Sequence, residues 1–238
     1  MDKNMTLEKR IDAELYSYQG RMSVFVDDLR GNTVEIGADE EFETASTIKA
    51  FILAVLYLQA SRGRADLEED ITYEASQFVD GSGMLRALGV GAKLKVKDTA
   101  TMMIICSDNI ATNMIIDYLG LDTINACIRE LGFGHTVLHN PLHFDRYDKL
   151  GTTTPRDYAA LFAQVAKGTL VSREASAAMP KAQGMAISIL NLMVRRILYM
   201  TSVWFFWARE RTMLGIMEVP REEATATGTL ESRRYLPP

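Results

Sequence analysis

The amino-acid sequence predicts a mixed fold, with an α/β part that opens the chain and an all-helical part that follows it. Two observations indicate this division. A helical pattern and then two strand patterns occupy residues 5–37, and from Ser46 to about Leu150 the apolar spacing is helical between turn signals such as "DGSG" and "GVGAK". A chain of 238 residues, 47% hydrophobic and 24% charged, can build one large or two small cores.

The individual elements follow from apolar spacing and turn chemistry. The first segment carries apolar side chains at helical spacing, and Gly20 closes it. The stretches "RMSVFVDDL" and "NTVEIG" predict two strands around the turn "RGN". Further on, "TTTPRDYAALFAQVAKG" predicts a helix with Thr154 as N-cap, Pro155 at the first helical position and Gly168 past the end.

The character of the sequence changes after Met179. A short helix is expected just before this point, at "VSREASAAM", with Ser172 as its cap. Beyond it, "MAISILNLMVRRILYMTSVWFFWARERTMLGIMEV" has no clear period of two or 3.6. Arg195 and Arg196 divide this stretch into pieces of about ten residues, which is too short to span a bilayer, so no membrane insertion is expected. The polar last residues predict a loose tail.

Composition and charge restrict the partners. The net charge of -5 comes from 26 basic and 31 acidic residues without long blocks of one sign, so a small soluble substrate is expected and a nucleic acid is not. Cys106 and Cys127 have no metal or redox spacing and are interpreted as reduced core thiols, and no cofactor is expected. The first residues contain no apolar stretch typical of a signal peptide. The chain as it stands predicts a cytoplasmic protein, or an exported one whose signal lies outside this chain.

Ser46 and Lys49 stand three positions apart in "ETASTIKAFILAVLYLQ", where a long apolar helix begins. Residues at this spacing share one helix face. A serine becomes a good nucleophile when a neighbouring base takes its proton, and a lysine among apolar side chains can have a lowered pKa. Free N–H groups at the helix N-terminus would stabilise an oxyanion. The alternative is a helix capped by Thr44 or Ser46, with Lys49 reaching solvent.

A second polar cluster, Ser107, Asp108 and Asn109, lies between the buried run "TMMII" and another amphipathic helix. A hydroxyl beside an amide at a helix entrance can pass on a proton and hold a substrate amide. The same residue types are also ordinary helix-capping chemistry.

Together, "STIK" and "SDN", 61 positions apart, resemble the first two motifs of the class A β-lactamases and their penicillin-binding relatives. "GSGML", "SDNIATNMIIDYLG" and "TTTPRDYA" resemble the same family in order and approximate spacing, so the likeness runs from about residue 8 to 179. It implies a β-lactamase-like fold, with an antiparallel sheet and flanking helices formed by residues 1–45 and about 190–238. Residues 46–189 would form a helical domain inserted between them.

The resemblance also implies a serine hydrolase that opens a β-lactam ring through an acyl-enzyme on Ser46. Lys49 would take part in proton transfer, Ser107 would pass a proton to the leaving nitrogen, and Asn109 would hold the substrate amide. The backbone N–H of Ser46 would form half of the oxyanion hole. A peptidase or esterase of the same family and a non-catalytic β-lactamase-like protein are the alternatives.

Two parts of the family pattern are missing. Where the family carries a glutamate that activates the deacylating water, this chain has "HNPLHFDRYDKLG", in which Asp145 and Asp148 are the only carboxylates, and slow deacylation is expected. These aspartates either act as the base or pair at the surface with Arg146 or Lys149. The Lys-Thr-Gly motif is absent as well, which removes a cation for the substrate carboxylate and leaves the last sheet strands in question. The change after Met179 fits either an altered reading frame or a divergent end.

The three histidines, His135, His139 and His143, follow one another at intervals of four, which on a continuous helix would form a metal-binding stripe. Pro141 and the preceding "GFG" would interrupt such a helix, and the resembled family uses no metal. No metal site is therefore expected.

Overall fold

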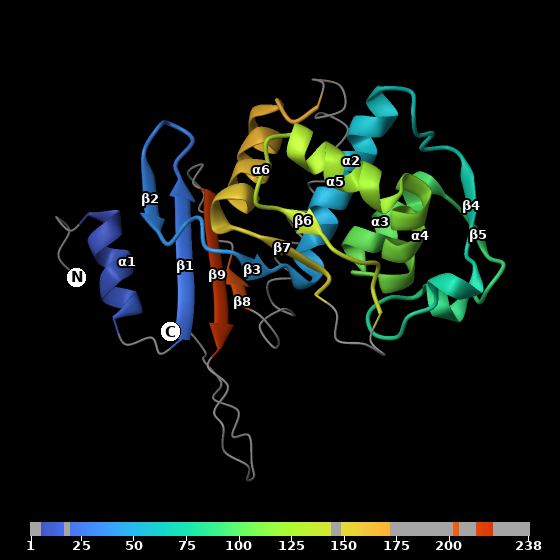
Figure 1. Ribbon diagram of the computed structural model, residues 1–238, viewed down its shortest axis with the longest axis horizontal. Helices are drawn as coiled ribbons and strands as arrows, with labels where there is room; N and C mark the ends of the chain where they lie inside the picture. Colours follow the sequence, from blue (N-terminus) through green and yellow to red (C-terminus); the bar gives the residue numbers. More distant parts are fainter. Residues whose placement is uncertain (1–5, 17–19, 144–148, 172–201, 205–212, 221–238) are drawn as a thin grey trace, which may run out of the picture.

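The computed structural model describes residues 6–16, 20–143, 149–171, 202–204 and 213–220 (Figure 1). In chain order, the elements are α1 (Leu7–Leu15), β1 (Gly20–Asp27), β2 (Thr33–Ile36), β3 (Phe42–Glu43), η1 (Ala45–Thr47), α2 (Ile48–Ser61), β4 (Asp70–Thr72), η2 (Ala75–Gln77), η3 (Leu85–Ala87), β5 (Lys93–Lys95), α3 (Val96–Ile105), α4 (Asn109–Leu119), α5 (Leu121–Glu130), β6 (Val137–Leu138), β7 (Gly151–Thr153), α6 (Pro155–Lys167), β8 (Ser202–Trp204) and β9 (Met213–Pro220).

The main sheet draws strands from both ends of the chain. Its order is β2-β1-β9-β8, and neighbouring strands are antiparallel. β1 and β2 form the hairpin expected from the sequence, and β1 pairs along its whole length with β9, from Gly20 opposite Pro220 to Asp27 opposite Met213. The antiparallel sheet is therefore confirmed, including strands from the region that had shown no period. β9 is a central strand of this sheet, between β1 and β8.

Helix α6 lies against β1 and β9 and has the ends predicted for it (Figure 1). The Thr154 hydroxyl accepts a hydrogen bond from the Asp157 N–H at 3.1 Å, and Gly168 ends the helix in the left-handed region, at φ 68°. The Arg156 guanidinium links this helix to β2 through Glu35 and to the segment after β2 through Asp39. The helix expected at "VSREASAAM" lies outside the described residues.

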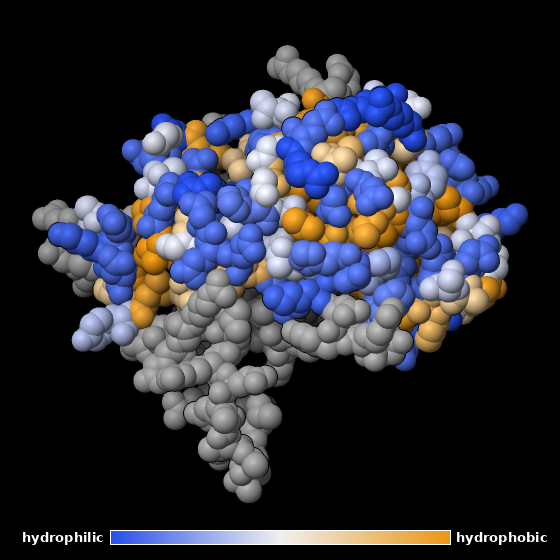
Figure 2. Space-filling view, in the orientation of Figure 1, coloured by the Kyte–Doolittle hydropathy of each residue, from blue (hydrophilic) through white to orange (hydrophobic). Residues whose placement is uncertain are grey.

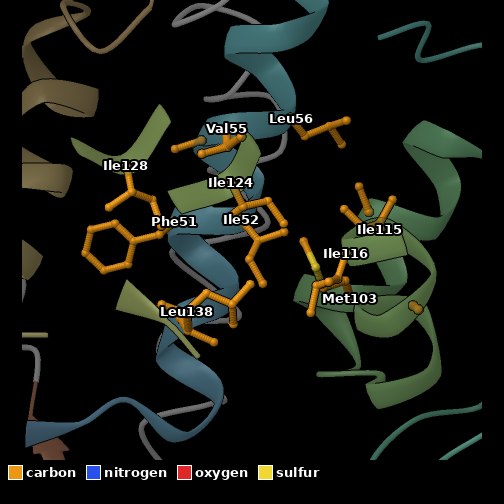
Figure 3. Close-up of a cluster of buried hydrophobic side chains, with 14 of the residues drawn as sticks. Phe51, Ile52, Val55, Leu56, Met103, Ile115, Ile116, Ile124, Ile128 and Leu138 are labelled. Carbon is orange, nitrogen blue, oxygen red and sulfur yellow. The ribbon is translucent and has the colours of Figure 1, made fainter. Parts of the chain in front are cut away.

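Helix α2 forms the centre of the main hydrophobic core. It packs against α3, α4 and α5, which explains why its sequence is apolar on nearly every side. In Figure 3, Phe51 of α2 lies beside Ile128 of α5, while Met103 of α3 and Ile116 of α4 lie on the other side of the helix. Each such buried side chain stabilises the fold by roughly 1.5–3 kcal/mol relative to an exposed one. This packing fixes the start of α2, where Ser46 and Lys49 lie.

β4, β5 and β6 lie within residues 46–150, so the wholly helical prediction for that range missed them. β4 pairs with β5, and β3, β7 and β6 form a three-stranded sheet. Each of these strands has only two or three residues, too few for a period of two to show in the sequence. The boundaries expected for the two domains stay a prediction. Among the described helices, none combines the length and apolar character needed to cross a bilayer.

Candidate active site

Ser46 lies in the 3₁₀ turn η1, which leads directly into α2. The chain turns sharply just before it, because Ala45 adopts a left-handed conformation at φ 42°. No side chain caps η1 or α2, and the Thr47 N–H donates instead to the Thr44 carbonyl oxygen at 2.9 Å. The alternative in which Thr44 or Ser46 caps the helix is therefore wrong, and the Ser46 hydroxyl is turned to other partners.

Lys49 is fully buried, with 0% of its surface exposed, so the alternative in which it reaches solvent is also wrong. Its Nζ lies 3.3 Å from Ser46 Oγ. Nζ also donates to the backbone oxygen and the Oγ of Ser107, both at 2.9 Å, and to Asn109 Oδ1 at 3.0 Å. These contacts bring together Ser46, Lys49, Ser107 and Asn109, the four residues of the two motifs that were predicted for the site.

Burial changes the proton affinity of the Lys49 amine. Desolvation disfavours its charged form and lowers the pKa of Lys49 to about 7, and the Asp108 carboxylate opposes part of that shift. Near neutral pH a large share of the amine is unprotonated, and it lies within reach of the Ser46 hydroxyl proton.

Ser107 and Asn109 are placed by the junction between α3 and α4. Ser107 sits in the left-handed region at φ 49°, a conformation that costs a residue other than glycine roughly 1–3 kcal/mol. Its Oγ lies 3.2 Å from Ser46 Oγ, so it contacts both the hydroxyl and the amine. Asn109 is the first residue of α4, and its Nδ2 donates to the Asp80 carbonyl oxygen at 3.1 Å. This bond uses one of the two hydrogens of the Asn109 amide.

Asp108 was not among the predicted site residues, but its carboxylate links the start of α4 to the backbone at Met84 and Leu85. It caps α4 by accepting from the Ala111 N–H, and its other carboxylate oxygen accepts from the N–H groups of Met84 and Leu85 at 2.6 and 2.9 Å. Gly83 permits this approach, since a Cβ there would lie 2.3 Å from the Asp108 carboxyl carbon. The two glycines of "DGSG", just before Met84, were the sequence signal for such close packing.

The segment that precedes β7 is anchored to α4 by one buried amide. Asn113 donates to the Leu142 carbonyl oxygen at 3.1 Å and accepts from the Leu142 N–H at 2.8 Å. Asn113 lies one helical turn beyond Asn109, so these two side chains project from the same face of α4. Asp145 and Asp148, the expected candidates for a deacylating base, lie outside the described residues.

Among the described histidines, His135 and His139 have hydrogen bonds to neighbouring residues. The His135 N–H donates to Asp157, and the His139 Nε2 lies 3.2 Å from Thr152 Oγ1. Within the described ranges, no cluster of three or more potential metal ligands occurs. Both cysteines have free thiols.

Comparisons with known proteins place this geometry in context. Residues 6–182 match a family model described as the "Beta-lactamase enzyme family". The SME-1 β-lactamase of Serratia marcescens is 25% identical over 189 residues, which are 74% of this chain and 62% of that protein. The chain thus spans less than two thirds of the length of this curated relative.

Solved structures show the same likeness. The crystal structure of a β-lactamase from Sphaerobacter thermophilus is 30% identical, with a TM-score of 0.65, over 72% of this chain and 65% of that one. The structure of PBP-A is 24% identical, with a TM-score of 0.73, over 90% of this chain and 87% of that one, and supports the fold.

Proposed function

The chain belongs to the β-lactamase enzyme family, and on that premise we propose that it is a class A type serine hydrolase that opens a β-lactam amide through an acyl-enzyme on Ser46. The observation that carries the proposal is the contact of one buried amine, Lys49 Nζ, with the hydroxyls of Ser46 and Ser107 and the amide of Asn109. A nucleophile beside a base, with the base oriented by further groups, is the arrangement that covalent catalysis requires.

Acylation would proceed in two proton transfers. The neutral Lys49 amine accepts the Ser46 hydroxyl proton while Oγ attacks the carbonyl carbon, and the carbonyl electrons move onto oxygen. The Ser46 N–H and the positive end of α2 stabilise this oxyanion. The C–N bond then breaks as Ser107 donates its proton to the leaving nitrogen and takes one from the Lys49 ammonium, 2.9 Å away. The products are an ester on Ser46 and a neutral Lys49.

Hydrolysis of the ester would be the slow step. It needs a water next to the ester carbonyl and a base for its proton, and residues 139–151 contain no glutamate. Asp145 and Asp148 are the proposed bases, because no other carboxylate occurs in that segment. Loss of a well-placed general base lowers a rate by about 10² to 10⁴, so the acyl-enzyme is expected to persist.

A peptidase or esterase activity is the second candidate. It agrees with a long-lived β-lactam adduct, because a β-lactam that acylates Ser46 and leaves slowly acts as an inhibitor of such an enzyme rather than as a substrate. A D-alanyl peptide or a small ester would use the same Ser46 and Lys49 pair. PBP-A, one of the structural neighbours, has been solved as an acyl-enzyme complex with penicillin-G in a mutant form.

Intact-protein mass spectrometry tests the proposal. Penicillin G should add its full mass to the wild-type chain, and the adduct should last for minutes or longer. Ser46→Ala should gain no mass. Lys49→Ala should acylate far more slowly than the matched control Lys167→Ala, whose lysine is exposed at the end of α6. An adduct that forms equally in Ser46→Ala would refute the nucleophile, and rapid nitrocefin turnover without an adduct would refute slow deacylation.

A further inference from the structure

Gly151 lies where the short sheet of β3, β7 and β6 meets residues 44–48, the nucleophile turn. It begins β7, pairs with Leu138 of β6, and its carbonyl oxygen accepts the Thr44 N–H at 2.9 Å. This bond extends the pairing of β3 with β7 to within two residues of Ser46. Hydrophilic and apolar side chains together cover the region of Figure 2 where Figure 1 places β6 and β7, and Gly151 is buried.

The chain leaves no room for a side chain at Gly151. A Cβ there would lie 2.7 Å from the Val137 carbonyl oxygen, 3.0 Å from Thr44 Oγ1 and 3.3 Å from Ile48 Cδ1. All three distances are shorter than an ordinary van der Waals contact of a Cβ, which is 3.4–4 Å. Thr44 and Ile48 are the two ends of the nucleophile turn. β7 therefore packs closely against both ends of this turn at a position where it carries no side chain.

The position of the nucleophile turn determines how Ser46 meets Lys49. The Thr44 carbonyl oxygen accepts from the N–H and the Oγ1 of Thr47, at 2.9 and 2.5 Å, and these bonds close the turn around Ser46. Ile48 then starts α2, and Lys49 is its second residue. A shift of Thr44 or Ile48 would therefore change the 3.3 Å distance from the Ser46 hydroxyl to Lys49 Nζ. Misplacement of a reacting group by about 1 Å can lower a rate by roughly 10²-fold.

The Thr44 hydroxyl takes no part in holding this junction together. Thr44 is 0% exposed, and within the described part of the chain its Oγ1 has no hydrogen-bond partner. Buried polar groups without a partner are uncommon. The backbone bond from Thr44 to Gly151 and the close packing around Gly151 therefore fix the turn, and the hydroxyl occupies space that a side chain at residue 151 would need.

We propose that Gly151 is a positioning residue for acylation: because it carries no side chain, β7 can hold both ends of the nucleophile turn and keep the Ser46 hydroxyl beside the Lys49 amine. The inference rests on the proposed function, in which Ser46 is the nucleophile. Since Gly151 is buried, it acts on the reaction through Thr44 and Ile48 and not through contact with the substrate. A side chain at residue 151 should therefore lower the rate of bond formation and leave the affinity for the substrate unchanged.

Acylation by penicillin G at several drug concentrations, followed by timed intact-protein mass spectrometry, tests the inference. The concentration dependence separates the maximal acylation rate from the half-saturating concentration. Gly151→Ala should lower the maximal rate by about tenfold to 10²-fold and leave the half-saturating concentration unchanged. The matched control Gly134→Ala, whose Cβ would meet nothing within 4 Å, should keep the wild-type rate. Circular dichroism and urea unfolding show whether each variant is folded.

A second substitution tests whether the effect passes through the nucleophile turn. Thr44→Ala removes the atom 3.0 Å from the added Cβ, and it breaks no hydrogen bond of Oγ1 within the described residues. The maximal rate of Gly151→Ala/Thr44→Ala should therefore exceed that of Gly151→Ala by about threefold or more, while Thr44→Ala alone stays within about twofold of the wild type. The recovery is partial because the Val137 carbonyl oxygen remains 2.7 Å from the added Cβ. If Gly151→Ala does not fold, the double variant is compared with Thr44→Ala and should still be the slower of the two.

Three results would overturn the inference while leaving the proposed function intact. A folded Gly151→Ala with the wild-type maximal rate would show that the turn keeps its position without a glycine at residue 151. A slower rate that Thr44→Ala does not restore at all would show that the effect bypasses the turn. Failure of both the single and the double variant to fold would assign Gly151 to stability alone. In all three cases the wild type still forms its adduct, whereas a wild-type chain that forms none would refute the proposed function and this inference with it.

Discussion

The rate of Ser46 acylation should depend on pH through the Lys49 amine. Burial lowers the pKa of Lys49 to about 7, and only the neutral amine can accept the Ser46 proton. The neutral fraction is then about 0.1 at pH 6, 0.5 at pH 7 and 0.9 at pH 8. The second-order acylation rate, followed by stopped-flow or timed mass spectrometry, should therefore rise about tenfold from pH 6 to pH 8 and level off above it.

Asp108→Asn provides the internal control for this profile. The Asp108 carboxylate favours the charged amine, so its removal should move the inflection to lower pH. The amide also supplies fewer acceptor atoms for the three N–H groups bonded there, so a lower rate at the plateau is expected too. A flat profile between pH 6 and 9, or an inflection that does not move in Asp108→Asn, would refute the role assigned to the Lys49 amine.

The same pKa shift predicts how stability changes with pH. Lys49 has a lower pKa in the folded chain than its ordinary value of 10.5, so between about pH 7 and 10.5 the unfolded chain binds more protons. The destabilisation is full below pH 7 and is relieved as the pH rises to 10.5, with a total of roughly 5 kcal/mol by the linkage relation. Urea unfolding at pH 6.5 and pH 9.5 measures this gain in the free energy of unfolding. The gain should be absent in Lys49→Met, and an equal gain in Lys49→Met and the wild type would contradict the assignment.

Three further substitutions test the surroundings of the site. Gly83→Ala should lower the free energy of unfolding by about 2–5 kcal/mol and slow acylation, because its Cβ would collide with Asp108. The control Gly63→Ala, whose Cβ would meet nothing within 4 Å, should lower it by about 1 kcal/mol. Equal losses in urea melts would argue against the close approach of Gly83 to Asp108. Asn113→Ala frees three backbone groups, at Gln77 and Leu142, and Asn125→Ala frees two at Leu138; each should destabilise by about 2–4 kcal/mol, but only Asn113→Ala should alter the adduct lifetime. Leu142→Glu should lower the free energy of unfolding by about 2–5 kcal/mol, because the Leu142 side chain is buried in the main hydrophobic core and a carboxylate there would have no partner; an unchanged midpoint in urea melts would contradict this placement.

The parts of the fold that the sequence predicted are those with strong local signals. The hairpin of β1 and β2 has turn residues between alternating runs, and α6 carries a cap, a proline and a terminal glycine in the expected order. The pairing of Ser46 with Lys49 was predictable because a three-residue spacing determines the face of a helix. In each case the pattern lies within one short stretch of chain.

Contacts between segments far apart in the chain were harder to predict from the sequence. β9 joins β1 across almost two hundred residues, and nothing in its composition reveals that partner. The link from Asp108 to Met84 depends on the path of a loop with two 3₁₀ turns, whose course no periodicity specifies. The motifs could therefore assign roles to Ser107 and Asn109, while the residue between them acquired its role only from the tertiary structure.

Asp108 connects the backbone at Met84 and Leu85 to the Lys49 amine through a single buried carboxylate. Its surface is 0% exposed, three N–H groups donate to its carboxylate, and no cation among the described residues bonds to it directly. A buried charge of this kind is costly unless it is fully hydrogen-bonded, so the backbone at Met84 and Leu85 must keep its position for the charge to stay. The same charge acts on the Lys49 amine. A change that loosens this backbone should therefore also alter the pH range in which the Lys49 amine is neutral.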